Sequence, residues 1–373
     1  MSSKRVLLMH ISHISGHRSA SLAIEKAIKA QSPQSETRSI NLFNYVHPRG
    51  EGIINFLYML MIRRFPFIWA YLYDNPYWVR KSRKLKDRIH RTNLPKLETL
   101  LKDFRPDVVV STQAFPCGLV AYFKRIKGVD FPLIAVMTDF VPHSYWIYDN
   151  VDYYITASQE ATQTLISKGI KPDRIKSLGI PFDLKFNQNQ HLDKAGARKT
   201  LGLKEDFFTI LVMGGGQGLG PIGTVIGVLD KLEFDVQLIV VCGTNKRVYA
   251  QLKKRLSSYK KEILLFDYAQ NVEALMSAAD IIITKPGGIT CAEALCKKLP
   301  MLIISPIPGQ EANNTAYLTA QGAAVGVKRP AGLIDIVTDL YNHPERLKEL
   351  SQACLRISRP RSAEDIAQLL LNL

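Results

Sequence analysis

The chain has 373 residues, 46 % of them apolar and 22 % charged, which is typical of a folded globular protein and excludes a disordered one. Its length favours two domains over a single core. The formal net charge of +16 indicates a polyanionic partner, such as nucleic acid, an anionic membrane or phosphorylated substrates. Five cysteines without a CxxC pair argue against a disulfide framework or a zinc site and favour a reducing cytoplasm.

Short apolar runs alternate with helical patterns along the chain. The runs predict strands at residues 6–11, 107–111, 133–137, 152–156, 208–213, 236–241, 263–266, 281–284, 301–304 and 324–327. Helical patterns fall between them, for example at residues 19–30, 158–168 and 272–278. This alternation predicts parallel sheets with helices on both faces.

The alternation breaks once, at the polar sequence PFDLKFNQNQH of residues 181–191, which we expect to be irregular. We therefore place an interdomain linker at residues 184–192, between domains at residues 1–183 and 193–355. Residues 356–373 are expected to form a helix that packs back on the first domain. Ligands of open α/β sheets bind beyond the carboxyl ends of the strands, so the loops there are candidate sites.

The first such loop, residues 12–20, contains Gly16 and His17. Gly16 permits a tight turn, and the following helix offers free N–H groups. A histidine there can take a proton from an attacking hydroxyl at neutral pH. The alternative is that His17 caps the helix or bonds to backbone.

A second loop of the first half, residues 138–146, offers Asp139 and His143 to a ligand and Trp146 as an apolar platform. Either histidine can also be structural. The segment from Phe56 to Arg91 is first aromatic and apolar and then basic, with Arg63, Arg64 and Pro66 interrupting its apolar part, so we do not expect it to span a membrane. It favours an interfacial contact with an anionic membrane over the alternative of a buried helix followed by a solvated one.

In the second half, the sequence MGGGQGLGP begins at Met213 and is neither a GxGxxG fingerprint nor a Walker loop. Its glycines Gly214, Gly215 and Gly216 let the backbone approach a ligand; the alternative is a flexible interdomain loop.

The sequence KPGGITCAEA, from Lys285, places Gly287 and Gly288 at a helix start, where N–H groups and the helix dipole favour a diphosphate. Thr290 adds a hydroxyl donor. The carboxylate of Glu293 can accept both hydroxyls of a ribose, or it can simply stabilise the helix dipole.

A last loop, residues 306–314, presents Gln310 and Glu311 at a strand end, which suits sugar hydroxyls but equally suits a capped helix start.

Together these motifs resemble the monogalactosyldiacylglycerol synthases and processive diacylglycerol glucosyltransferases, relatives of the enzyme that adds N-acetylglucosamine to peptidoglycan lipid precursors. The matching segments follow the family's order: GHRSASLAIEKAI, TDFVPHSYW, VDYYITAS, GIKPDRIKSLGIPFDLKF, MGGGQGLGPI, KPGGITCAEAL and IPGQEANN.

The resemblance implies a GT-B fold of two facing Rossmann-like, doubly wound α/β domains and an inverting transfer of a hexose from UDP-glucose or UDP-galactose. The implied acceptor is a membrane lipid, diacylglycerol or a glycosyl-diacylglycerol, with no cofactor, no metal and no nucleic acid. It also implies a peripheral protein on the cytoplasmic face of the cell membrane. Same-fold nucleotide-sugar 2-epimerases and a non-catalytic basic membrane- or nucleic-acid-binding protein are the alternatives.

The resemblance also assigns roles. His17 matches the candidate base, His143 the second histidine of the acceptor side, and Asp139 can orient either imidazole. The residues assigned to the donor are Gly214, Gly215, Gly216, Tyr268, Gly287, Gly288, Thr290, Glu293 (ribose), and Gln310 and Glu311 (sugar).

Overall fold

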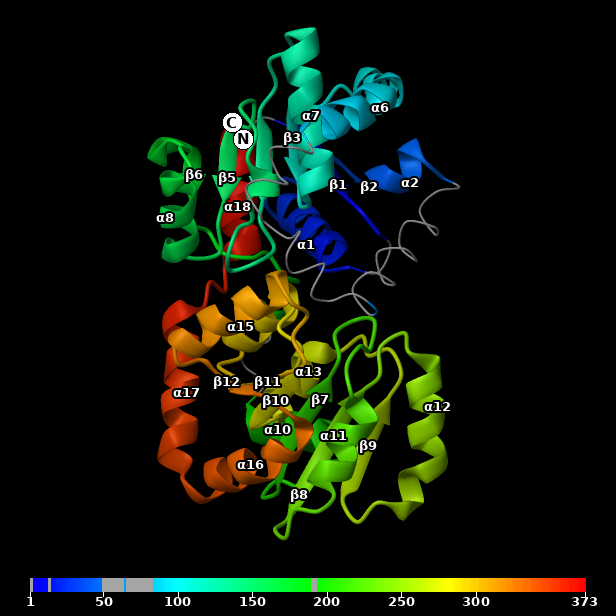
Figure 1. Ribbon diagram of the computed structural model, residues 1–373, viewed down its shortest axis with the longest axis vertical. Helices are drawn as coiled ribbons and strands as arrows, with labels where there is room; N and C mark the ends of the chain where they lie inside the picture. Colours follow the sequence, from blue (N-terminus) through cyan, green and yellow to red (C-terminus); the bar gives the residue numbers. More distant parts are fainter. Residues whose placement is uncertain (1–2, 13–14, 49–63, 65–82, 189–192) are drawn as a thin grey trace. The chain divides into compact units, whose positions relative to one another are not determined.

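The computed structural model describes residues 3–12, 15–48, 64, 83–188 and 193–373. The chain forms two compact units (Figure 1). Unit 1 comprises Met1–Leu184, Ile307–Asn313 and Arg361–Leu373; unit 2 comprises Lys185–Pro306 and Asn314–Pro360. Most of the segment from Phe56 to Arg91 lies outside the described residues. No helix among the described residues is long and apolar enough to cross a membrane.

Unit 1 is built on a parallel sheet with the strand order β2-β1-β3-β4-β5-β6. The strands are β1 (Arg5–His10), β2 (Glu36–Asn41), β3 (Val108–Ser111), β4 (Leu133–Val136), β5 (Tyr153–Ile155) and β6 (Ile175–Lys176). The helices are α1 (Gly16–Gln31), α2 (Leu42–Val46), α6 (Arg83–Phe104), α7 (Ala114–Lys127), α8 (Gln159–Ser167) and α18 (Ser362–Asn372), with the 3-10 turns η1 (Ser144–Trp146) and η2 (Pro172–Arg174).

Both faces of this sheet are buried, because successive strand residues point to opposite faces. Val6 and Leu8 of β1 lie in one core with residues of α1 and α18, which pack against each other. Leu7 and Met9 lie in a second core with residues of α6 and α7. The apolar run at residues 6–11 therefore needs no alternation with polar residues to form a strand.

Unit 2 is built on a second parallel sheet, with the order β12-β11-β10-β7-β8-β9. The strands are β7 (Phe208–Met213), β8 (Val236–Val241), β9 (Glu262–Phe266), β10 (Ile281–Thr284), β11 (Met301–Ile304) and β12 (Ala324–Val327). The helices are α9 (Lys185–Gln188), α10 (Lys194–Thr200), α11 (Ile222–Leu229), α12 (Lys246–Arg255), α13 (Val272–Ala278), α14 (Gly288–Cys296), α15 (Gln310–Ala320), α16 (Leu333–Asn342) and α17 (Pro344–Ile357), with η3 (Leu256–Ser258) and η4 (Pro330–Gly332). The start of α15, up to Asn313, belongs to unit 1.

The predicted strands are confirmed, five of them (β7, β8, β10, β11 and β12) with the predicted bounds. Strands β2 and β6 were not predicted. The expected irregularity of residues 181–191 is wrong in part, since Lys185–Gln188 form the helical turn α9. The aromatic side chain of Phe186 is buried, which explains why this polar stretch does not remain a solvated loop.

Candidate functional site

The strand order reverses once in each sheet, and His17 and the two glycine-containing candidate loops lie at these two places. In unit 1 the chain continues from β1 to β2 on one side and returns to β3 on the other; in unit 2 β7 lies in the same way between β8 and β10. Loops leaving two such strands diverge, which opens a crevice beyond the carboxyl edge of the sheet. His17 follows β1, and the loops beginning at Gly214 and Lys285 follow β7 and β10.

His17 lies in the first turn of α1, and both partners of its Nδ1 atom come from neighbouring strand ends. Nδ1 is 2.8 Å from the carbonyl oxygen of Thr112, after β3, and 2.9 Å from the hydroxyl of Thr138, after β4. A carbonyl oxygen can only accept, so this contact assigns the hydrogen of the neutral ring to Nδ1. The lone pair is then on Nε2.

Burial lowers the pKa of His17 to about 4, and the hydrogen bond to the Thr112 carbonyl opposes that shift. The imidazole is therefore neutral at pH 7, as a proton acceptor must be. The alternative that His17 bonds to backbone is observed, but it involves Nδ1 and leaves the basic nitrogen Nε2 for chemistry.

Thr112 and Thr138 are the residues that sequence reasoning missed. Both are buried, and the Thr112 hydroxyl also donates to the carbonyl oxygen of His17 at 2.8 Å. Thr112 directly follows β3 and Thr138 lies two residues after the end of β4, and a hydroxyl at a strand end was the signal that could have found them.

The turn before His17 is made differently from the prediction. Ser12, rather than Gly16, adopts a positive φ of 63°, and Gly16 is already the first residue of α1. Ser15 is the N-cap, and its side chain accepts from the amide of Arg18, so one of the N–H groups expected to be free is taken. A non-glycine residue in this conformation stores strain, which is common beside functional sites.

Asp139, predicted to orient an imidazole, and Gln310, predicted to bind the sugar, are in contact within unit 1. The Gln310 side-chain amide donates to the carboxylate of Asp139, which is buried. His143 lies half-buried at the start of η1, with its ring centroid 6.1 Å from that of Trp146. Trp146 itself is buried in the core and is 2 % exposed, so it does not offer a ligand the apolar platform that was predicted.

The glycine-rich loop after β7 is tightly packed against the turn after β8. A Cβ on Gly218, which has a φ of 59°, would lie 1.7 Å from the carbonyl oxygen of Cys242. The Gly216 carbonyl accepts from the amide of Thr244 at 3.0 Å, and the Gly214 carbonyl from that of Leu219 at 2.9 Å. At least part of the glycine pattern therefore serves loop packing.

The loop after β10 lies beside it. Thr284 pairs with Met213 in the sheet, and its hydroxyl donates to the Met213 carbonyl at 2.7 Å. Gly287 is the N-cap of α14 and offers no side-chain bond to the helix amides, which leaves them available to an anion. Thr290 and Glu293 are half-buried on the same helix.

The last two residues assigned to the donor are Glu311 and Tyr268. Glu311 accepts from the amide of Ile307 at 2.7 Å, in the turn that precedes α15. Tyr268 follows β9 and its side chain is 56 % exposed.

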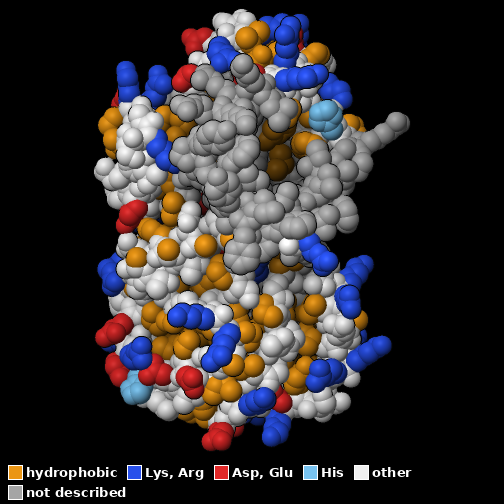
Figure 2. Space-filling view, in the orientation of Figure 1, with side chains coloured by type: hydrophobic (Ala, Val, Ile, Leu, Met, Phe, Trp, Pro, Cys, Tyr) orange, Lys and Arg blue, Asp and Glu red, His pale blue; other side chains and the backbone are white. Residues whose placement is uncertain are grey.

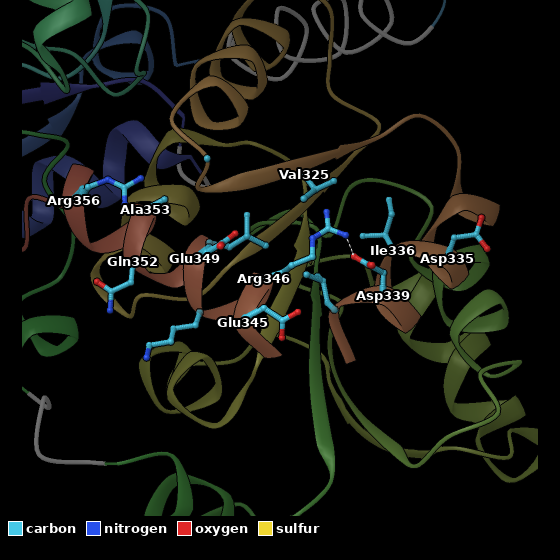
Figure 3. A pocket seen from close by; sticks show the side chains of 14 residues that line it. Val325, Asp335, Ile336, Asp339, Glu345, Arg346, Glu349, Gln352, Ala353 and Arg356 are labelled. Carbon is cyan, nitrogen blue, oxygen red and sulfur yellow. Dashed lines mark hydrogen bonds and ion pairs between the residues drawn. The ribbon is translucent and has the colours of Figure 1, made fainter. Parts of the chain in front are cut away.

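A hollow of about 890 Å³ in unit 2 lies between α16 and α17 and contains none of the assigned residues (Figure 3). Gly322, which precedes β12, and Val325, within that strand, also line it. Arg346 and Asp339 form an ion pair within it. None of its lining residues belongs to the loops that follow β7 and β10.

Two family models match the chain: monogalactosyldiacylglycerol (MGDG) synthase over residues 17–182 and the glycosyltransferase family 28 C-terminal domain over residues 209–370. The processive diacylglycerol beta-glucosyltransferase of Bacillus pumilus is 27 % identical over 98 % of this chain and 94 % of its own length. The enzyme of that name from Bacillus licheniformis is 28 % identical over 97 % and 93 %.

Solved structures share the fold at lower identity. MurG of Acinetobacter baumannii has a TM-score of 0.62 at 15 % identity, over 99 % of this chain and 100 % of that one. A UDP-GlcNAc 2-epimerase from Neisseria meningitidis has a TM-score of 0.63 at 16 % identity, with the same coverage. The predicted GT-B fold class is thereby confirmed.

The packing of the glycine-rich loop predicts that Gly218→Ala destabilises unit 2. A methyl group there meets backbone, and its φ is unfavourable for alanine, so the loss should exceed about 1 kcal/mol. Gly223→Ala is the matched control, because it lies in α11 with open space beside its Cβ position and should stabilise by about 0.5–1 kcal/mol. Urea denaturation measures both. Equal urea midpoints for the two variants would show that the loop accommodates the added methyl group without loss of stability.

The environment of His17 predicts an unusual pH dependence. With a folded-state pKa of about 4 against an ordinary 6.5, kcat/KM should show no titration of this group between pH 7 and pH 5. The unfolded chain takes up this proton first, so His17 stabilises folding above pH 6.5 and that contribution is lost as the pH falls toward 4. The prediction is wrong if the wild-type protein loses activity with a midpoint near pH 6.5 and this titration is absent from a His17 variant.

Proposed function

We propose that this chain, whose two halves match the MGDG synthase and glycosyltransferase family 28 C-terminal models, transfers a hexose from a UDP-sugar, with inversion, to diacylglycerol or a glycosyl-diacylglycerol. The observation that carries this proposal is the position of His17, whose Nδ1 contacts the Thr112 carbonyl and the Thr138 hydroxyl, so that Nε2 is its basic nitrogen. The names of the curated relatives support the lipid acceptor. UDP or a UDP-sugar in several structural neighbours supports the donor.

In the proposed reaction the acceptor hydroxyl gives its proton to Nε2 of His17 while its oxygen attacks the anomeric carbon. The bond from that carbon to the UDP oxygen breaks on the opposite side, which inverts the configuration. The amides at the start of α14 stabilise the departing diphosphate without a metal ion. Glu293 holds the ribose, and Gln310 and Glu311 hold the sugar.

The remaining parts of the proposal concern location. The protein acts at the cytoplasmic face of the cell membrane, and the segment from Phe56 to Arg91 contributes to that contact. Its composition supports this, because aromatic and basic residues together favour a membrane interface.

A nucleotide-sugar 2-epimerase is the competing function, because such enzymes are among the structural neighbours. Those likenesses are near 15 % identity and reflect the fold. The relatives that align over nearly the whole chain at 27–28 % identity are named as glucosyltransferases, which favours transfer.

The proposed activity predicts label in the lipid phase when the protein is incubated with a radiolabelled UDP-hexose and diacylglycerol in vesicles. Turnover should persist in EDTA, because helix amides stabilise the leaving group. The same protein with UDP-GlcNAc should give no inversion at C2 by NMR. Lipid phase without label, together with C2 inversion, would identify an epimerase; a strict requirement for Mg²⁺ or Mn²⁺ would refute the metal-free mechanism.

Two variants should separate proton transfer from donor binding. His17→Asn can still donate to the Thr112 carbonyl but has no base, so kcat should fall about 10²–10⁴-fold with unchanged UDP affinity. Glu293→Ala loses charge-assisted hydrogen bonds of about 1.5–3 kcal/mol each, so UDP affinity should fall tenfold or more. Calorimetry and initial rates measure the two effects. Near-normal turnover of His17→Asn, with an inactive His143→Ala or Asp139→Asn, would move the base to the second loop.

A further inference from the structure

The helix α12 and the turn after it carry seven basic residues and no acidic one over residues 246–261. They form what we call the α12 face: Lys246, Arg247, Lys253, Lys254, Arg255, Lys260 and Lys261. The first six are exposed and Lys261 is half-buried. Figure 2 shows Lys and Arg side chains along the side of unit 2 where Figure 1 places α12.

The helix is anchored from its opposite side. Leu252 is buried in the core of unit 2, and Val248 and Tyr249 pack against that core half-buried. One turn beyond Leu252, Leu256 is 37 % exposed. The basic side chains therefore flank an apolar stripe that is buried at Leu252 and exposed at Leu256.

Helix stability explains only part of this charge. The last turn of α12 contains Lys253, Lys254 and Arg255, where the helix dipole favours cations. Lys246 and Arg247 lie in the first turn, where the dipole disfavours cations, and that turn contains no acid. Within the part of the chain that the structure describes, no ion pair involves a side chain of the α12 face. The next acid in sequence, Glu262, pairs with Lys204 at 2.6 Å. Asp230 accepts from the backbone amides of Lys260 and Lys261.

We propose that the α12 face binds the anionic headgroups of a lipid membrane, as a membrane contact of unit 2. This rests on the proposed function, because the acceptor there is a membrane lipid. Uncompensated cations complement anionic headgroups, and an open Leu256 among them suits the boundary between headgroups and acyl chains. Tyr249 and Tyr259 lie under the cations of Lys253 and Arg255, each 5.7 Å from ring centroid to cation, and tyrosine is favoured at membrane interfaces.

The test uses the full chain and vesicles of phosphatidylcholine with or without 30 % phosphatidylglycerol. In one variant Lys246, Lys253, Lys254 and Arg255 are replaced by Gln. In the matched control the same change is made at Lys328, Arg329, Lys348 and Arg356, which are also exposed on unit 2. Each charge near an anionic surface is worth about fivefold in partitioning, so the α12 variant should bind anionic vesicles at least about tenfold more weakly, and the control much less.

Equal losses in both variants would show that net charge alone is responsible, and an unchanged α12 variant would show a merely solvated helix. Selective loss of binding to a 20-nucleotide DNA at physiological salt, with vesicle binding intact, would assign the face to nucleic acid instead. The proposed function is tested separately, by transfer to a short-chain diacylglycerol in detergent, which the α12 variant should perform normally. If the wild-type protein binds vesicles through the α12 face but transfers no sugar, the proposed function is wrong and the proposed membrane contact still holds.

Discussion

The reversal of strand order beside β1 and beside β7 is the constraint on which the rest of the site depends. A parallel sheet with both faces covered leaves its strand ends as the places where backbone and polar side chains meet solvent. At the reversal, the loops on the two sides diverge and a ligand can reach the backbone between them. His17 with Thr112, and the loop at Gly214 with the loop at Lys285, stand at those two points. Neither arrangement depends on a particular sequence motif; each requires only residues that fit its position after a strand.

The buried strands could be predicted from sequence because they are continuous apolar runs between turn residues, and five were predicted to the residue. The edge strand β2, with the sequence ETRSIN, could not be recognised, since its residues are mostly polar and only half-buried or exposed. Likewise β6 is two residues long. The histidine was found from its place after a strand, whereas Thr112 and Thr138 were not, because a threonine at a strand end is too common to single out without knowing which side chain faces it.

Glycine was the least informative signal in the candidate site. Gly287 and Gly218 read alike in sequence, as glycines in loops after strands of the same sheet. In the structure they do different things: Gly287 begins a helix with open space beside it, whereas Gly218 lets the loop lie against the Cys242 carbonyl. A glycine-rich loop can therefore owe its composition to a neighbouring turn, and the ligand-facing positions within it cannot be separated from the packing positions by pattern alone.

The surroundings of His17 resolve an apparent conflict in its chemistry. Burial keeps the imidazole neutral, and therefore able to accept a proton, but the same burial makes it a weak base with a pKa of about 4. The Thr112 carbonyl opposes this effect where it matters. Its oxygen is already 2.8 Å from Nδ1, so the bond needs no rearrangement when the ring becomes positive, and a hydrogen bond from a charged donor is stronger than one from a neutral donor. The hydrogen bond to the Thr112 carbonyl therefore becomes stronger as the proton reaches Nε2, which stabilises the transition state. Before the reaction the ring remains neutral.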